Sequence, residues 1–278
     1  MPFKDILVHV DDGAACSQRL EIATRLATTY GAHLIGLHVG LPLHLPGAIA
    51  PDLGGEVARL HAQYRAQSSA AARAIFEHAV QLAGLSNEWR DVTGDIVDTM
   101  AMHARYADLA VIGQTDEDDG SLAGAHRLSD HLPLLAGTPV LVVPAVGHYP
   151  VVGEKVLVAW NAGREARRAV SDAMPILARA RQVVVMVINP NEGAASHGEV
   201  PGADIGLHLA RHGVTAVCET IQADDIDVGN MLLSRVSDEG VDLLVMGAYG
   251  RSRFREVILG GATRQILGQM TVPVFMSH

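Results

Sequence analysis

The sequence predicts an α/β fold made of two tandem, doubly wound parallel sheets of five strands each. Short apolar runs alternate with helical patterns along the whole chain of 278 residues, which is typical of parallel α/β sheets. The first half of the chain also resembles the second half, so one unit is repeated. The near-continuous apolar runs indicate strands that are buried on both faces.

Three pairs of segments carry the repeat, in the same order in both halves. The pairs are residues 4–13 with 154–163, 107–113 with 241–247 and 138–142 with 272–276. The first pair is offset by 150 positions and the other two by 134, so the second unit is 16 residues shorter than the first in its middle. We expect domains at 1–148 and 152–278, and a long loop rich in Pro and Gly over 41–55.

The elements of the second unit follow from its hydrophobic pattern. A helix is expected over 164–181, because its apolar residues recur at helical spacing on one face. Strands are expected at 155–160, 183–189, 214–221, 242–247 and 273–276. In such a fold the ligand crevice lies beyond the carboxyl ends of the strands, where the winding reverses.

Composition narrows the class of protein. Apolar residues make up 49% of the chain and charged residues 19%, which predicts a packed core. The net charge of −10 disfavours binding to nucleic acid, which requires a basic surface. Residues 1–150 carry 9 basic and 17 acidic side chains, whereas the remainder carries 12 and 14. An anionic ligand would therefore prefer the second half.

The sequence gives no reason to expect a membrane or an export route. Its apolar runs are strand-sized, and its start lacks a basic segment followed by a long apolar one. The two cysteines, Cys16 and Cys218, are too far apart in sequence to indicate a disulfide framework or a zinc site. We expect a cytoplasmic protein with reduced cysteines.

The most informative segment, residues 247–263, follows a predicted strand and enters the last helix. Its glycines permit close approach of a ligand, and the amides at the start of the helix would point at an anion. Arg251, Arg253 and Arg255 add positive charge in an otherwise acidic protein. The segment is interpreted as a phosphate-binding loop, with turns and a solvated arginine loop as the alternative.

The spacing Gly-x2-Gly-x9-Gly after a strand ending in Val-Met-Gly, with a closing Val-Pro-Val strand, resembles the universal stress protein family. With the repeat, the whole chain resembles a tandem, Rossmann-like member. The resemblance implies that Gly247, Gly250 and Gly260 hold the ribose and phosphates of ATP, with or without Mg²⁺. Gly261 departs from the Ser or Thr usual in the family, which leaves backbone amides as the donors.

The resemblance also implies positions for the base and the sugar. A family aspartate at the end of the first strand aligns with Asn161, and a valine that contacts adenine through its backbone aligns with Val187. Trp160 either stacks on the base or packs in the core. The full set of expected nucleotide-binding residues is Ala159, Asn161, Val187, Gly247, Gly250, Arg251, Arg253, Gly260, Gly261, Ala262 and Thr263.

The first unit is an internal control for this assignment. Gly250 corresponds to Asp116 and Gly260 to His126, and four carboxylates occupy 116–119. These charges would repel a triphosphate, so the first unit is expected to be a degenerate nucleotide site. A cation site in this acidic run is disfavoured because the run lacks the ligand spacing of a calcium loop.

Two histidine pairs are the remaining candidates. His208 and His212 lie one turn apart on a predicted helix but lack the glutamate of a zinc protease motif, so an exposed pair is expected. His9 and His38, on adjacent strands of the first unit, could face one another near its crevice, but core histidines with satisfied hydrogen bonds are expected.

We therefore expect a stress-response binding and regulatory protein without catalytic residues, whose second domain binds ATP. A slow ATP hydrolase or adenylyl-group enzyme is one alternative, and a nucleotide-free dimerisation module is another. The expected partners are an adenine nucleotide and, within the chain, the two units as a pseudo-dimer that pairs through the final strands. The family resemblance also allows a homodimer of chains.

Overall fold

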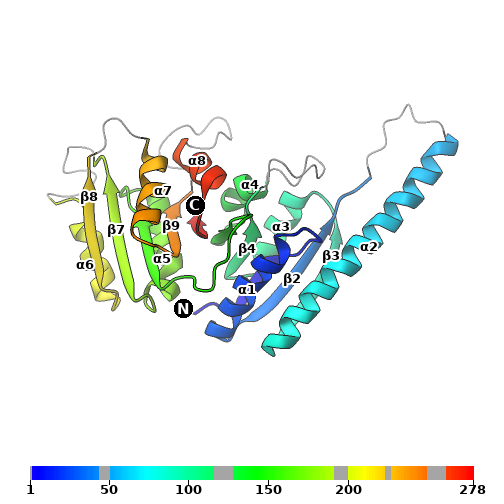
Figure 1. Cartoon of the computed structure of the whole chain (residues 1–278), viewed down its shortest axis with the longest axis horizontal. Coiled ribbons are helices and arrows are strands. Elements are labelled where there is room, and N and C mark those ends of the chain that lie inside the picture. Colours follow the sequence, from blue (N-terminus) through cyan, green and yellow to red (C-terminus); the bar gives the residue numbers. More distant parts are fainter. Residues whose placement is uncertain (1, 44–50, 116–127, 191–199, 223–226, 249–260) are drawn as a thin grey trace.

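The computed structural model describes residues 2–43, 51–115, 128–190, 200–222, 227–248 and 261–278. Strands and helices alternate along the chain (Figure 1). The elements are β1 (Asp5–His9), α1 (Cys16–Tyr30), β2 (His33–Gly40), α2 (Pro51–Ala83), β3 (Asn87–Thr93), α3 (Ile96–Ala104), β4 (Leu109–Gly113), α4 (Leu128–Leu135), β5 (Val140–Val143), β6 (Lys155–Ala159), α5 (Arg164–Leu177), β7 (Gln182–Ile188), α6 (Ala203–Arg211), β8 (Ala216–Ile221), α7 (Val228–Asp238), β9 (Leu243–Gly247), α8 (Gly261–Gln269) and β10 (Val274–Ser277).

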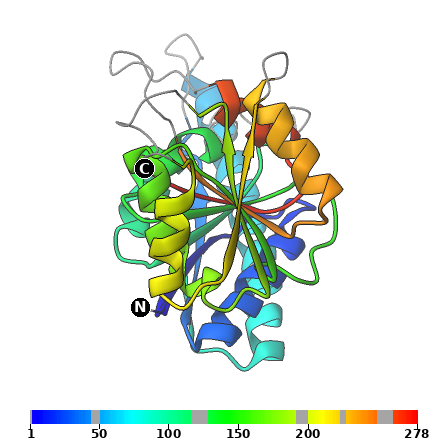
Figure 2. The same cartoon turned by 90° about the vertical axis from the view of Figure 1, so that its left-hand side faces the viewer.

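The strands form one ten-stranded sheet in the order β3-β2-β1-β4-β5-β10-β9-β6-β7-β8. Within each half all neighbouring strands are parallel, and the order within one half repeats that of the other. The predicted fold class of two doubly wound five-stranded units is thus confirmed. Figure 2 looks along the sheet and shows the strands fanning about a common axis, as the right-handed strand twist requires.

Helices cover both faces of the sheet. The buried strands carry apolar side chains on both faces, so each face packs against helices. Buried residues of α1, α2, α5 and α6 pack in one hydrophobic cluster, and those of α3, α4, α7 and α8 in another. Each cluster contains residues from both halves of the chain. The molecule therefore has two core layers that are shared between the repeats.

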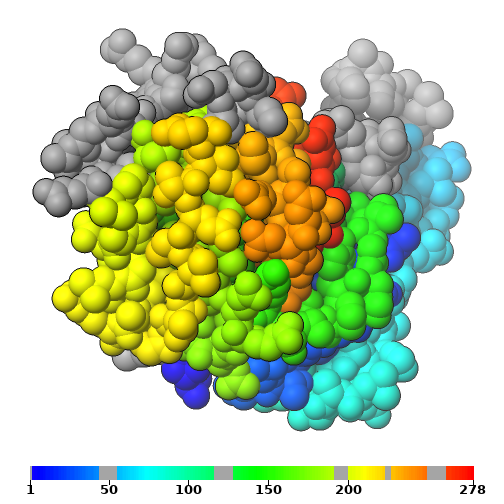
Figure 3. Space-filling view, turned by 60° about the vertical axis from the view of Figure 1, so that its left-hand side comes forward, coloured from blue at the N-terminus to red at the C-terminus, as the bar shows by residue number. Residues whose placement is uncertain are grey.

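The two halves join where β5 pairs with β10 in antiparallel orientation, with Leu141 opposite Phe275. Both side chains are fully buried. Beside this seam, Gln114 Nε2 donates to the carbonyl of Leu267 at 2.7 Å, and the space-filling view shows the C-terminal residues in red against green residues of the first half (Figure 3). The predicted pairing of the two units through their final strands is confirmed.

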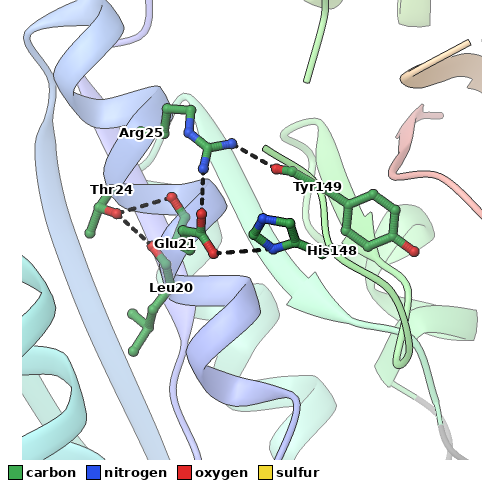
Figure 4. Close-up of polar contacts among 6 residues, drawn as sticks. All are labelled: Leu20, Glu21, Thr24, Arg25, His148 and Tyr149. Atoms are coloured by element: carbon green, nitrogen blue, oxygen red, sulfur yellow. Dashed lines mark hydrogen bonds and ion pairs between the residues drawn. The ribbon is translucent and has the colours of Figure 1, made fainter. Parts of the chain in front are cut away.

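Polar contacts tie the linker between the halves to α1 (Figure 4). One nitrogen of the Arg25 guanidinium donates to the Tyr149 carbonyl at 2.7 Å and the other to the Glu21 carboxylate at 2.6 Å. The same carboxylate lies 3.9 Å from His148 Nδ1. Glu21 and Arg25 are one turn apart on α1, so this helix fixes the path of the linker over it.

In both halves an aspartate carboxylate accepts hydrogen bonds from backbone amides at the start of the first strand. Asp108 accepts hydrogen bonds from the backbone amides of Lys4 and Asp5 at 2.6 and 3.1 Å. At the equivalent position, Asp242 accepts from the backbone amides of Gly153 at 2.5 Å and Lys155 at 2.8 Å. The repeat therefore extends from the sequence to specific hydrogen bonds that set the start of β1 and β6.

Helix α2 corrects one expectation. The predicted loop over 41–55 is shorter, because α2 begins at Pro51 and runs for 33 residues. Proline is favoured at the first position of a helix, where its missing N–H has no partner to lose. The corresponding α6 of the second half has only 9 residues. Figure 1 shows α2 extending past the end of the sheet.

Among the described helices, none has both the length and the apolar character that crossing a bilayer requires. Both cysteines are free thiols, Cys16 buried and Cys218 exposed.

The shared core makes a prediction about stability. Replacing Phe275 with alanine removes a fully buried ring at the seam, so we expect the free energy of unfolding to fall by about 3–5 kcal/mol. Urea denaturation followed by circular dichroism measures this change. The matched control is Tyr106→Ala, whose side chain is 78% exposed, with an expected change within about 0.5 kcal/mol. A loss below about 1 kcal/mol for Phe275→Ala would contradict a core shared across the seam.

Candidate nucleotide-binding site

A cavity of about 130 Å³ opens beyond the carboxyl ends of the central strands in the second half. Its walls come from β6, β7 and β9, from the first turn of α5, and from α7 and α8. The apolar part of the lining is Ala159, Trp160, Ala166, Met186, Ile188, Val228, Leu232, Met246 and Ala262, and the remainder is Asn161, Glu165, Gly247 and Thr263. This is the place where doubly wound sheets bind ligands.

The structure brings together only part of the expected residue set. Ala159, Asn161, Gly247, Ala262 and Thr263 line the cavity. Gly261 is exposed and begins α8. Gly250, Arg251, Arg253 and Gly260 lie outside the described residues. These four positions therefore stay predictions.

Val187 lies between two lining residues without lining the cavity itself. Met186 and Ile188 face the cavity, whereas Val187 Cγ2 comes within 3.5 Å of the position that a Cβ at Gly202 would take. Side chains alternate across a strand, so Val187 points to the opposite face. Its backbone remains next to the cavity wall, which is the part that the family resemblance assigns to adenine.

Asn161 shapes the turn between β6 and α5. Its Oδ1 accepts a hydrogen bond from the Gly163 amide at 2.9 Å, and the intervening Ala162 has a positive φ of 55°. In the first half Asp11 Oδ1 accepts from the Gly13 amide at 3.1 Å in the same way. Both Asn and Asp form such turns, so the neutral amide preserves the local backbone.

Gly247 is required by close packing. A Cβ at this position would lie 2.6 Å from the Ala166 nitrogen and from the Glu165 carbonyl carbon. Since both are backbone atoms, no side-chain rotation could relieve the clash. The absence of a side chain at the end of β9 lets the first turn of α5 approach the sheet and form one wall of the cavity.

Helix α8 begins at the mouth of this cavity. Its first three residues are Gly261, Ala262 and Thr263, and its first turn contains no acidic residue. The first amides of a helix have no partner within the helix and carry partial positive charge, which favours an anion. Thr263 is only 4% exposed. The described start of α8 therefore favours an anion, and the cavity beside it is lined by apolar side chains together with Asn161 and Glu165.

Sequence reasoning missed Glu165, the carboxylate of the cavity. It lies in the first turn of α5, is buried, and accepts from Arg164 Nε at 2.7 Å. Burial acts to raise the pKa of Glu165, but the Arg164 hydrogen bond and other favourable contacts outweigh it and lower the pKa. The carboxylate is therefore ionised at neutral pH. An acidic residue at the start of the first helix was the available signal.

The equivalent crevice of the first half contains a histidine. His9 ends β1 as Ala159 ends β6, and both face the α3/α4/α7/α8 side of the sheet. The imidazole is 7% exposed. Several other lining positions are conservatively replaced, with Leu37 for Met186 and Met100 for Leu232. The His9 imidazole therefore occupies a space that the smaller Ala159 side chain leaves open in the second half.

A buried ionic cluster surrounds that histidine. Arg19 is 4% exposed and donates to the His9 carbonyl at 2.7 Å and to Asp11 Oδ2 at 2.8 Å. A Cβ at Gly113 would lie 2.5 Å from Arg19 Nη1. The guanidinium thus lies against the end of β4, beside the glycine that corresponds to Gly247. Among the described residues, side chains of the protein itself close this crevice.

The cluster shifts two pKa values. Burial lowers the pKa of His9 from 6.5 to about 4, against the opposing attraction of Asp11. For Asp11, burial acts to raise the pKa, but Arg19 and His9 together with the Gly13 amide lower it from 3.8 to about 2. At neutral pH the cluster therefore contains a neutral imidazole, a carboxylate and a guanidinium.

The other histidine candidates from the sequence, His38 and the pair His208 and His212, form no shared site in the described part of the chain. His38 lies on the opposite face of β2 from the His9 side, and its Nδ1 is 2.9 Å from Asp91 Oδ1. The rings of His208 and His212 are tilted by 47° with centroids 4.5 Å apart, and His212 Nδ1 is 2.9 Å from the His208 carbonyl. Within the described ranges, no three His, Cys, Asp or Glu side chains are grouped to hold a metal ion.

Comparison with known proteins gives the same family for both halves. Residues 2–144 and 153–278 each match the model of the universal stress protein family. The whole fold is similar to the crystal structure of a universal stress protein from Archaeoglobus fulgidus DSM 4304, with a TM-score of 0.73, 14% identity and coverage of 98% of this chain and 97% of that chain. A functionally unknown protein from Pseudomonas aeruginosa PAO1 is also similar, with a TM-score of 0.62, 14% identity and coverage of 99% and 92%.

Alignments with curated relatives are short. Universal stress protein Slr1230 from Synechocystis is 46% identical over 37 residues, which are 13% of each chain. Universal stress protein MJ0577 from Methanocaldococcus jannaschii is 36% identical over 39 residues, 14% of this chain and 24% of that protein. The chain thus spans less than a quarter of the length of either relative in these alignments.

The closed crevice makes a prediction about acid stability. The unfolded chain protonates His9 near pH 6.5, whereas the folded chain keeps it neutral down to about pH 4. The unfolded state therefore binds more protons in this window, so stability is fully present above pH 6.5 and falls towards pH 4, by about 3 kcal/mol. The contribution of Asp11 to stability is lost at lower pH, from about pH 3.8 towards pH 2. Urea midpoints measured across this range should show both losses.

The variant His9→Gln should flatten the dependence between pH 6.5 and 4 and leave the loss at lower pH in place. His212→Gln, an exposed histidine in the other half, is the matched control and should retain the wild-type profile. An unchanged slope in His9→Gln would mean that another group titrates in this window.

Proposed function

Because the chain belongs to the universal stress protein family, we propose that its second half binds an adenine nucleotide, ATP in the first instance, in the cavity beyond β6, β7 and β9. The protein would act as a stress-response binding and regulatory protein. The base would lie against the apolar wall of Met186, Ile188 and Met246. The ribose would approach Asn161 and the end of β9.

One observation supports this proposal most strongly: an apolar cavity and a helix N-terminus meet at one place. A nucleotide has an apolar, planar base at one end and an anionic phosphate chain at the other. The apolar lining suits the base, and the amides at the start of α8 suit the phosphates. Gly250, Arg251, Arg253 and Gly260 would complete the phosphate contacts, as the family resemblance implies.

Glu165 bears on the choice between binding and catalysis. Its ionised carboxylate would accept hydrogen bonds from ribose hydroxyls, or bind Mg²⁺ together with phosphate oxygens and water. It is also the observation that favours the alternative of a slow ATP hydrolase. A carboxylate with a lowered pKa is a weak general base, however. We therefore propose binding rather than turnover.

The first half would contribute structure rather than a second nucleotide site. His9 and Arg19 fill its crevice, and the sequence places four carboxylates at 116–119. The alternative of a nucleotide-free dimerisation module would predict such a closed crevice in both halves. We further propose the cytoplasm as the compartment, because both cysteines are free thiols.

A titration of purified protein with ATP tests the proposal. We expect about one site per chain by calorimetry, because the second half has a cavity at its crevice and a basic glycine loop, whereas the described part of the first-half crevice is occupied by His9 and Arg19. Gly250→Asp copies Asp116 of the first half and should abolish binding, since it adds a Cβ and a charge where phosphate would approach. The circular dichroism spectrum should be unchanged. Two sites per chain, or unchanged affinity in the folded variant, would refute the assignment.

A second variant tests the base pocket independently of the glycine loop. Ala159→His introduces the first-half residue into the cavity, and we expect the affinity for ATP to fall at least about tenfold because the ring fills the base pocket. The first half already accommodates histidine at this position, so the fold should persist. Ala210→His on the exposed side of α6 is the matched control and should bind like wild type. Equal affinity in the two variants would exclude this cavity as the base site.

A further inference from the structure

A second cavity, of about 320 Å³, lies near the amino ends of the strands, at the opposite end of the sheet from the candidate nucleotide site. Its walls are the second half of α1, the end of α5, and the linker residues 150–154 that lead into β6. Both halves of the chain therefore contribute to it. Its volume lies within the range of roughly 300–1,000 Å³ that is typical of small-molecule sites.

The buried part of the lining is aliphatic. Ile22 and Leu26 of α1 and Ile176 of α5 line the cavity, and all three are at most 5% exposed. Gly153 lets the linker approach them, because a Cβ at this position would lie 2.5 Å from Ile176 Cγ2. Its φ of 93° also lies in the left-handed region that favours glycine. This wall therefore suits a branched aliphatic group of a ligand.

Arg25 fixes the shape of the cavity without adding net charge to it. One nitrogen of its guanidinium donates to the Tyr149 carbonyl, which holds the start of the linker (Figure 4). Another nitrogen lies 2.6 Å from the Glu21 carboxylate and forms an ion pair with it. Glu21 compensates the charge of Arg25, so the charge that a ligand meets comes from other residues of the lining.

Arg179 and Glu154 supply that charge. The Arg179 guanidinium lies over the Tyr30 ring, 5.7 Å from its centroid, and the Tyr30 hydroxyl donates to the Pro175 carbonyl at 3.2 Å. The ring thus holds the guanidinium by a cation–π contact that leaves its positive charge in place. Within the described ranges, neither Arg179 nor Glu154 forms a side-chain ion pair, with the other or with a third group.

We propose that this cavity binds a free α-amino acid with a branched aliphatic side chain. The α-carboxylate pairs with Arg179, the α-ammonium pairs with Glu154, and the side chain lies against the aliphatic wall. A zwitterion meets both charges of the lining with the opposite sign. A simple anion would be repelled by Glu154 and a simple cation by Arg179, so a ligand with both charges is favoured over either.

The position of the cavity gives this binding a structural consequence. Ile22 and Leu26 belong to the first half of the chain, whereas Ile176 and Arg179 belong to the second. A bound amino acid contacts both halves and the linker between them. Since the complete cavity exists only in the folded chain, the ligand also stabilises the folded state by mass action.

Amide NMR spectra of the full chain, titrated with L-leucine in the absence of nucleotide, test this site independently of the proposed function. We expect a dissociation constant of about 1 mM, as is usual for so small a ligand. The amides of Val152 and Gly153 should shift. The probe 4-methylpentanoate lacks the ammonium group and 3-methylbutylamine lacks the carboxylate, so each should bind at least about fivefold more weakly than L-leucine.

Variants of the two charged residues test their roles. Arg179→Gln and Glu154→Gln should each weaken L-leucine binding at least about threefold, the size expected for an ion pair at a solvent-accessible site. Glu154→Gln should also reduce the preference for L-leucine over 4-methylpentanoate, because it removes the carboxylate that repels the anion. Arg181→Gln, which is exposed just beyond Arg179 and outside the lining, is the matched control and should bind like wild type.

Three results would overturn the proposal. The first is the absence of shifts at Val152 and Gly153 up to about 20 mM L-leucine. The second is binding of 4-methylpentanoate or 3-methylbutylamine as tight as that of L-leucine, which would mean that one charge of the ligand is not recognised. The third is unchanged L-leucine affinity in both Arg179→Gln and Glu154→Gln.

Discussion

The antiparallel pair of β5 and β10 joins two five-stranded sheets through strands of only four residues each. Without this pair, both strands would be exposed apolar edges and would invite uncontrolled association. With it, the backbone hydrogen bonds continue across the seam, and the two hydrophobic clusters each contain residues of both halves. The position of every other element depends on this contact, since it fixes one repeat relative to the other.

On this common scaffold the two crevices differ in what fills them. In the first half, buried Arg19 is stabilised by Asp11 and by the His9 carbonyl, which offset the cost of removing its charge from water. In the second half, Ala159 leaves the corresponding space open. These differences, the buried Arg19 in the first half and the exchange of His9 for Ala159, leave open in the second half a space that side chains occupy in the first.

The sequence predicted the strands well because buried parallel strands are short, apolar and bounded by turns. The five strands expected in the second unit each overlap an observed strand, with ends that differ by up to two residues. The alignment along a strand does not show which residues face the cavity, however: the prediction named Val187, whereas its neighbours Met186 and Ile188 line the cavity. Glu165 and the packing role of Gly247 depend on how closely α5 approaches β9, a tertiary distance that no local pattern encodes.

The length of α2 was hidden for a related reason. Proline and glycine near residues 41–55 indicate a loop, yet a proline can equally start a helix, and only the following pattern decides. The apolar residues of α2 also follow two stripes, one buried through Phe76 and one exposed through Tyr64. A helix with two apolar stripes has an ambiguous periodicity from sequence, because a single buried face is the usual expectation.

If the chain binds a nucleotide as we propose, an acidic protein must concentrate positive potential near the site of an anion. Charges more than about 8 Å away are largely screened at physiological salt, so the excess of acidic residues in the first half has little influence on a ligand in the second. The local field depends instead on the amides at the start of α8, on the absence of acidic residues from its first turn, and on the arginines of the preceding segment. The local field at the start of α8, rather than the net charge of the chain, therefore favours an anion in the proposed site.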